Sequence, residues 1–211
     1  MNALSHTPRG LTAWQRTVKR SVDLFAASIG LTLATPVIAV AWVLAARDTG
    51  QGGFFRQERI GRDGQPFRIW KLRTMRSVVG VASTATAADD PRITPLGRTL
   101  RAYKIDELPQ LFNVLRGEMS LVGPRPDVPG FADRLEGDDR IVLSVRPGIT
   151  GPATLAFRDE ERLLAEQPDP EAYSRDVIYP RKVQLNRAYV EDYTLLTDLK
   201  CLFHTVRRVV R

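Results

Sequence analysis

Cysteine and histidine are scarce in this sequence. Its 211 residues include one cysteine, Cys201, and two histidines. A single cysteine excludes an internal disulfide framework and is compatible with a reducing compartment. So few soft ligands also exclude a structural zinc site. Any metal ion that the protein binds should therefore be hard and oxygen-coordinated.

The sequence also lacks the composition of a disordered chain. Hydrophobic residues make up 43% of it and charged residues 26%, and a globular chain of this length can bury its own core as one domain. Lys and Arg number 31 against 24 Asp and Glu, for a net charge of +7. This excess is compatible with nucleic acid, anionic lipid headgroups or phosphorylated substrates, so the positions of the basic residues must decide.

Charge is missing from one long segment near the start. Residues 24–46 read LFAASIGLTLATPVIAVAWVLAA, and as a helix they would reach about 35 Å, enough to cross a bilayer core. The run is long for the apolar part of a signal peptide, and no clean cleavage site accompanies it. A buried helix of a soluble core is disfavoured because no face of the segment is polar.

Proline and the flanking charges favour a re-entrant hairpin over a simple span. Pro36 follows Thr35 near the middle, where proline removes a backbone donor and kinks a helix, and a threonine hydroxyl can satisfy a freed carbonyl. A span concentrates Lys and Arg on its cytoplasmic side. Here basic residues flank both ends: Arg9, Arg16, Lys19 and Arg20 before, and Arg47, Arg56 and Arg59 after. The pattern predicts a helix-break-helix over residues 17–47, with a spanning helix as the alternative.

The remaining chain is predicted to be mostly α-helical with a small β element. Short strands are expected at 54–55 and 67–73 around a turn at 61–64, helices at 94–103, 107–116, 160–166 and 171–192, and a loop at 77–90. Residues 198–211 carry apolar side chains at helical spacing opposite Lys and Arg. That terminal helix either docks on the core or lies on anionic lipid as an interfacial helix.

The densest group of chemically active residues is the pair Asp106–Glu107 with basic residues before it. Adjacent carboxylates at this position are commonly just the cap and acidic first turn of a helix. The same position would keep a carboxylate ionised and nucleophilic, and a second carboxylate could hold Mg²⁺ together with substrate phosphates. Arg98, Arg101 and Lys104 could then neutralise a diphosphate.

A second candidate is Arg125, which stands between Pro124 and Pro126. Two prolines stiffen the loop and can pre-organise the guanidinium for a phosphate or the face of a base. An ordinary proline-rich turn explains the same residues about equally well.

Five motifs in fixed order give the sequence a family resemblance. They are Lys19-Arg20-x-x-Asp23, Trp70-Lys71-Leu-Arg73-Thr-Met75, Asp106-Glu107-Leu-Pro-Gln-Leu, Gly117-Glu-Met-Ser-Leu-Val-Gly-Pro-Arg-Pro126 and Pro147-Gly-Ile-Thr-Gly151. Together they resemble the bacterial sugar transferases, the monotopic polyprenyl-phosphate phosphoglycosyl transferases, in their minimal form. The resemblance is strong over residues 17–155. It implies one domain over 1–211, with a membrane hairpin at 17–47 and a compact cytoplasmic catalytic part at 48–211 that carries amphipathic interfacial helices.

The resemblance also implies a reaction and a location. The family moves a sugar-1-phosphate from a UDP-sugar to polyprenyl (undecaprenyl) phosphate with Mg²⁺ and releases UMP. This would be the first membrane step of glycan assembly, on the cytoplasmic face of the bacterial inner membrane. Polyprenyl phosphate, UDP-sugar and membrane lipids would be the partners, without nucleic acid, and a homodimer is compatible with the sequence.

Residue roles follow from the matched motifs. Asp106 would be the nucleophile that forms a phospho-sugar intermediate, and Glu107 with Asp106 would hold the metal. The resemblance assigns the substrate phosphates and nucleotide to Arg101 and Arg125, and Lys71 and Arg98 are further candidates for the same role. It places the membrane break at Thr35 and Pro36, and Lys19, Arg20 and Asp23 would form a membrane-interface motif.

The sequence departs from the family pattern at one place, and two other classes of function can be compared with the enzyme. After Gly151 many relatives carry a Trp and a Gln-Val-Asn-Gly-Arg stretch, whereas this chain reads PATLAFRDEE over 152–161, which bears on the sugar or the acceptor. A nucleic-acid-binding protein is supported only by net charge, since no recognition motif is present. A non-catalytic membrane anchor would leave Asp106, Glu107 and Arg125 without a role.

Overall fold

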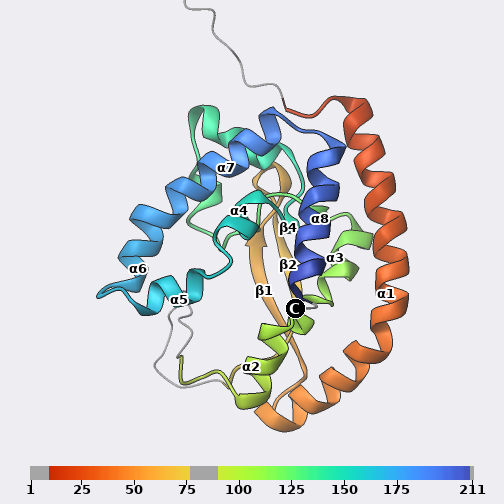
Figure 1. Cartoon of the computed structure of the whole chain (residues 1–211), viewed down its shortest axis with the longest axis vertical. Helices are drawn as coiled ribbons and strands as arrows, with labels where there is room; N and C mark the ends of the chain where they lie inside the picture. The colour runs from red at the N-terminus through yellow and green to blue at the C-terminus, as the bar shows by residue number, and fades with distance from the viewer. Residues whose placement is uncertain (1–9, 77–89, 210–211) are drawn as a thin grey trace, which may run out of the picture.

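The computed structural model describes residues 10–76 and 90–209. The predicted loop at 77–90 and the last two residues of the predicted terminal helix therefore lie almost entirely outside the described residues. The described part is mostly helical with two small two-stranded sheets, which confirms the predicted fold class at that level. In Figure 1 a long N-terminal helix runs along one side, a β-hairpin occupies the middle, and the C-terminal helices cover the rest.

The N-terminal helix α1 (Ala13–Thr49) is one continuous helix of 37 residues. A capping box between Thr12 and Gln15 starts it, and Gly50 in the left-handed region ends it. Among the described helices it is the one that is long and apolar enough to cross a membrane by length and composition. Its secondary structure is not interrupted at Pro36, so the predicted helix-break-helix is not observed as two helices. In Figure 1 α1 bends toward α2 at its C-terminal end.

Proline is tolerated within α1 because only one hydrogen bond is lost. Pro36 has no N–H to give to the carbonyl of Thr32, and its ring pushes that carbonyl away, which bends a helix without ending it. The Thr35 hydroxyl donates to the carbonyl of Leu31 at 2.7 Å. It therefore reinforces the neighbouring turn, and the freed carbonyl is not the one that it satisfies.

The face of α1 toward the domain consists mainly of small side chains, and most of its large apolar side chains face away. The buried apolar positions are Ala27, Ile38, Ala41 and Ala45, and Leu31 and Ala34 continue this stripe half-buried. Small residues let a helix backbone approach its neighbours closely. Large apolar side chains are exposed on the outer side: Phe25, Ile29, Leu33, Val37, Val40, Trp42, Val43 and Leu44. The segment therefore has an apolar inner face and an outer face that carries most of the large apolar side chains together with the hydroxyls of Ser28, Thr32 and Thr35.

The predicted strands form an antiparallel hairpin of β1 (Phe54–Ile60) and β2 (Pro66–Leu72). Asp63 and Gly64 take left-handed conformations in the connecting turn, where Asp and Gly are tolerated. Phe55 and Lys71 are paired in the register. Because side chains alternate along a strand, Lys71 and Arg59 lie on one face of the hairpin and Trp70 on the other.

The middle of the chain supplies the site. It contains α2 (Pro95–Ala102), the 3₁₀ turn η2 (Ile105–Glu107), α3 (Gln110–Arg116), β3 (Ser120–Val122), 3₁₀ segments η3 (Ala132–Arg134) and η4 (Gly137–Ser144), and β4 (Gly148–Thr150). Strands β3 and β4 are parallel. Gly148, at the start of β4, lies so close to Gly123, directly after β3, that a Cβ on Gly148 would be 2.1 Å from the nitrogen of Gly123. Two motif glycines therefore fix the start of the Pro-Arg-Pro loop.

Helices complete the domain. They are α4 (Pro152–Ala156), α5 (Glu160–Ala165), α6 (Pro170–Tyr173), the π-helical turn η5 (Ser174–Ile178), α7 (Tyr179–Glu191) and α8 (Leu195–Val209). In Figure 1 α8 lies beside α1, and α6 and α7 lie on the opposite side of the hairpin. Helix α8 docks through Asp198 and Cys201, while Leu199, Phe203 and Val206 are exposed. The terminal helix therefore docks on the core, as one of the two alternatives predicted, and its contact with anionic lipid through the exposed face stays a prediction.

Candidate active site

The carboxylate pair lies on η2, ahead of α3. Lys104 turns the chain with a left-handed φ of 55° before the pair, and Pro109 has no N–H to continue the turn into a helix. Asp106 and Glu107 are 6% and 8% exposed. The helix predicted to start at Glu107 therefore starts at Gln110, and neither carboxylate lies in its first turn.

Glu107 is held by two cations. Its Oε1 accepts from Arg125 Nη2 at 2.6 Å and from Lys71 Nζ at 3.4 Å, and its Oε2 accepts from Arg125 Nη1 at 3.2 Å. Burial alone would raise the pKa of Glu107, but the charges of Arg125 and Lys71 outweigh it and hold that pKa well below its usual range. Glu107 is therefore a fixed anion in a bidentate pair.

Asp106 differs from its neighbour in having a free oxygen. Its Oδ1 is buried, and no described residue donates a hydrogen bond to it. Burial and the adjacent charge of Glu107 raise the pKa of Asp106, and Lys71, Lys104 and Arg101 oppose that rise. The first turn of an α-helix, which was expected to keep Asp106 ionised, is not where Asp106 lies; Lys71, Lys104 and Arg101 favour its ionised form without reversing the rise of its pKa. A buried, unpartnered and more basic carboxylate oxygen is suited to nucleophilic attack.

The Pro-Arg-Pro loop is braced from both sides. The nitrogen of Gly148 donates to the carbonyl of Pro124 at 2.7 Å, and Arg59 Nη1 donates to the carbonyl of Pro126 at 3.1 Å. The charge of Glu107 raises the pKa of Arg125. The loop therefore is stiff, as predicted, but the observed partner of the Arg125 fork is Glu107. A role toward substrate phosphate stays a prediction.

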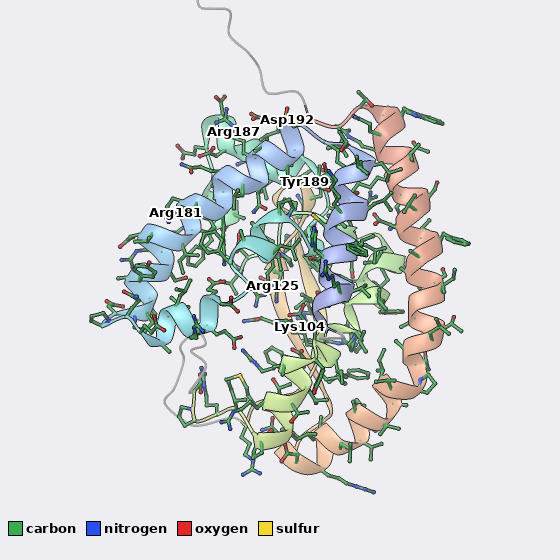
Figure 2. All side chains as sticks on the ribbon, viewed as in Figure 1. Lys104, Arg125, Arg181, Arg187, Tyr189 and Asp192 are labelled. Carbon is green, nitrogen blue, oxygen red and sulfur yellow. The ribbon has the colours of Figure 1, made fainter. Side chains whose placement is uncertain are left out.

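The basic residues of α2 are divided. Arg101 is 20% exposed and forms an ion pair with Glu161 of α5, and its Nη1 lies 3.8 Å from the sulfur of Met75. Arg98 is exposed on the same helix, and Lys104 is exposed beside η2. Figure 2 shows Lys104 and Arg125 toward the middle of the molecule, away from Arg181 and Arg187 on α7. Lys71 and Arg125 thus contact Glu107, Lys104 and Arg101 act on Asp106 through their charge alone, and Arg98 lies on the surface.

The Lys19–Asp23 motif contacts the domain. Lys19 Nζ lies 2.6 Å from Asp198 Oδ2, and Arg20 donates to the carbonyls of Val114 and Leu115 at the end of α3. Asp23 accepts from the Ser120 hydroxyl at 2.7 Å and from the nitrogen of Leu121 at 3.0 Å. The motif therefore fastens α1 to the domain, and its assignment to the membrane interface stays a prediction.

Sequence reasoning missed a buried residue that aligns the site. Asn113 is fully buried; its Oδ1 accepts from the nitrogen of Trp70, and its Nδ2 donates to the carbonyl of Arg68 and to Glu118. It ties α3 to β2, which carries Lys71. The signal was an Asn next to the apolar stripe of α3, because a polar residue at a buried position must find partners. Gln110, one turn after Asp106, is also buried, and its Nε2 has no partner among the described residues.

The carboxylate pair fits a hard cation of the type predicted. Among the described residues no group of three or more His, Cys, Asp or Glu side chains could hold a metal ion. Mg²⁺ characteristically takes one or two carboxylates and completes its shell with phosphate oxygens and water. Asp106 Oδ1 has no partner, and Glu107 Oε2 has one hydrogen bond at 3.2 Å. These two oxygens match that donor set.

Asp127, just beyond the loop, provides a test of the electrostatics. Burial raises its pKa to about 6, although Lys182 and Arg59 oppose the rise. The folded state therefore holds this proton more tightly than the unfolded state between pH 3.8 and about 6, so stability falls as pH rises through that window. We expect Asp127→Asn to stabilise the protein by about 1–2 kcal/mol at pH 8 and by little at pH 4. Thermal unfolding at both pH values measures this difference, and equal shifts would contradict it.

Comparison with known proteins assigns the chain to a family. Buried carboxylates ringed by arginine and lysine are typical of enzymes that bind phosphate groups. Residues 14–211 match the model of the bacterial sugar transferase family. The chain belongs to that family and is a transferase of sugar phosphates. The family resemblance inferred from the five motifs is thereby confirmed.

Relatives of this chain include proteins of three bacteria. Exopolysaccharide production protein ExoY of Rhizobium meliloti is 33% identical and matches 90% of this chain and 84% of its own length. The undecaprenyl-phosphate galactose phosphotransferase of Salmonella typhimurium is 34% identical over 93% of this chain and 41% of its own. The undecaprenyl-phosphate glucose phosphotransferase of Komagataeibacter xylinus is 35% identical over 96% and 37%. The chain thus spans about two fifths of the length of the last two.

Proposed function

We propose that this chain transfers a sugar-1-phosphate from a UDP-sugar to undecaprenyl phosphate, with release of UMP. The observation that carries the proposal is the buried, unpartnered Oδ1 of Asp106 beside cations that oppose the rise of its pKa. Relatives named undecaprenyl-phosphate phosphotransferases support the acceptor. Their names differ in the sugar, so we assign none. The reaction would be an early membrane step of polysaccharide synthesis.

The chemistry proceeds in two displacements. Asp106 Oδ1 attacks the phosphorus that carries the sugar, the bond from that phosphorus to the UMP oxygen breaks, and UMP leaves with the electron pair. An oxygen of the acceptor phosphate then attacks the same phosphorus, and the bond to Asp106 breaks to free the carboxylate. Each step exchanges one P–O bond for another, so no other co-reactant is needed.

Nearby cations have separate tasks in this scheme. Arg101 and Lys71 offset the negative charge of the diphosphate, and Arg125 fixes Glu107 as an oriented anion. Mg²⁺ bound at Glu107, with Asp106 adjacent, would offset the charge that develops on the departing UMP. Asn113 keeps α3 and β2 in register, so that Lys71 and the carboxylate pair stay on the same side.

The membrane supplies the acceptor in this proposal. Both halves of α1 pack on the same domain: Lys19 and Asp23 contact Asp198 and Ser120, and Ile38 and Ala41 pack in a cluster with Leu72 and Leu100. A helix fastened along its length to a polar domain would have to drag that domain into the bilayer in order to span it. We therefore propose that the outer apolar face of α1 enters one leaflet, with the catalytic part on the cytoplasmic side of the inner membrane.

Cysteine labelling tests this topology. We expect an impermeant maleimide added outside intact cells to miss both Thr17→Cys and Glu58→Cys in a Cys201→Ala background, because both positions would face the cytoplasm. Thr17 and Glu58 are exposed and lie on either side of the uncharged segment 24–46. Permeabilised cells should label both and serve as the control. Labelling of either position from outside would support a spanning helix and contradict the re-entrant arrangement.

A half-reaction assay tests the chemistry. Detergent-solubilised protein incubated with labelled UDP-sugar and Mg²⁺, but no undecaprenyl phosphate, should release about one equivalent of UMP per active site. The peptide that contains Asp106 should gain the mass of a phospho-sugar. A panel of UDP-sugars in the full reaction would identify the sugar. If UMP appears only when both substrates are present and no adduct forms, transfer is direct and the two-step route is wrong.

A further inference from the structure

Helix α5 carries two carboxylates into the neighbourhood of the site. Glu161 forms its ion pair with Arg101 of α2, and both Glu160 oxygens accept from Lys182 of α7 at 2.6 and 2.7 Å. The start of α5 is thus held between two cations from different helices. These glutamates belong to the stretch 152–161, where the sequence departs from the family pattern.

Arg101 is the less exposed partner of its ion pair. Its side chain is 20% exposed, whereas that of Glu161 is 47% exposed. A half-exposed carboxylate keeps much of its hydration and is held weakly, while the guanidinium stays within the electrostatic reach of Asp106. A phosphate of the incoming donor presents two oxygens to the planar Arg101 guanidinium, as the Glu161 carboxylate does, and carries more negative charge than that carboxylate.

We infer that Glu161 competes with the donor diphosphate for Arg101 and so sets the affinity of this enzyme for its nucleotide-sugar. This inference rests on the proposed function, in which Arg101 binds the donor. Without donor, the Glu161 carboxylate forms an ion pair with the Arg101 guanidinium. Donor binding displaces the carboxylate into solvent, where its exposure makes release inexpensive. Glu161 is thus a determinant of donor binding that does not touch the reacting phosphorus.

UDP binding measured by calorimetry in the presence of Mg²⁺ tests the inference. We expect Glu161→Gln to bind UDP about two- to fivefold more tightly than the wild type, in line with the strength of exposed ion pairs. Glu166→Gln is the matched control, because this substitution removes the same charge from the other end of the same helix. The described partner of Glu166 is Arg162, 3.9 Å away on the surface. That variant should bind UDP like the wild type.

The Arg101→Gln background distinguishes competition between Glu161 and UDP for Arg101 from long-range electrostatic repulsion of UDP by Glu161. In Arg101→Gln protein, Glu161→Gln should leave UDP affinity unchanged, since no guanidinium remains to compete for. Persistence of the gain in that background would overturn the inference in favour of long-range repulsion. Weaker or unchanged UDP binding by folded Glu161→Gln would overturn it as well. If the wild type binds no UDP at all, the proposed donor itself is wrong, which is a distinct outcome.

Discussion

Replacement of Asp106 by Asn should abolish both turnover and formation of the phospho-sugar adduct. An amide nitrogen or oxygen is a poor nucleophile toward phosphorus, so the first displacement is lost. We expect a fall in turnover of about a thousandfold or more, the scale seen when a covalent nucleophile is removed. UMP release without acceptor and mass analysis of the Asp106 peptide measure the two effects.

Stability separates this result from unfolding. Burial and the charge of Glu107 disfavour the ionised form of Asp106 in the folded state. Removing that charge should therefore leave the melting temperature equal to that of the wild type or raise it. A folded Asp106→Asn protein that still forms an adduct, or that turns over within tenfold of the wild type, would contradict the nucleophilic role of Asp106.

Glu107→Gln is the complementary variant. It keeps the size of the side chain but removes the anion that Arg125 and Lys71 hold. Both half-reactions should slow, and the concentration of Mg²⁺ needed for half-maximal rate should rise. Adduct formation by this variant, even if slow, would distinguish the role of Glu107 from that of Asp106.

Arg125 carries the second large expected effect. Arg125→Ala leaves Glu107 buried with Lys71 as its remaining described partner, and a buried charge without its pair is costly. Because the Arg125 side chain is 38% exposed, solvent screens the loss, and we expect about 1–3 kcal/mol in stability. Turnover should fall about a hundredfold or more, as when one pre-organised electrostatic contact is removed from an active site.

Lysine at the same position tests geometry against charge. Arg125 donates to both oxygens of Glu107 through Nη1 and Nη2, and an ammonium cannot reproduce that planar fork. Arg125→Lys should therefore lose nearly as much turnover as Arg125→Ala, while Arg181→Lys on the exposed surface of α7 should change nothing. Near-normal turnover of Arg125→Lys would mean that charge alone is required and that the bidentate pair is dispensable.

Local patterns in the sequence determined most of the secondary structure. The short strands expected around the turn at 61–64 are observed as the hairpin, and the helix expected at 94–103 is observed as α2. The predicted helix at 171–192 is observed as α6, η5 and α7 in succession. These features depend on neighbours a few residues away, which a single sequence displays. The order of motifs likewise was enough to name the family.

The sequence by itself also singled out Asp106 and Glu107 as the candidate site, since two carboxylates and their flanking basic residues are adjacent in the chain. Only the tertiary structure decided which carboxylate is paired and which is free, because Lys71 and Arg125 reach Glu107 from segments 36 and 18 residues away. It also decided that α1 packs on the domain through Lys19 and Asp23, whose partners lie 179 and 97 residues away. Burial and long-range pairing set pKa values and helix paths, and neither property is encoded in local spacing.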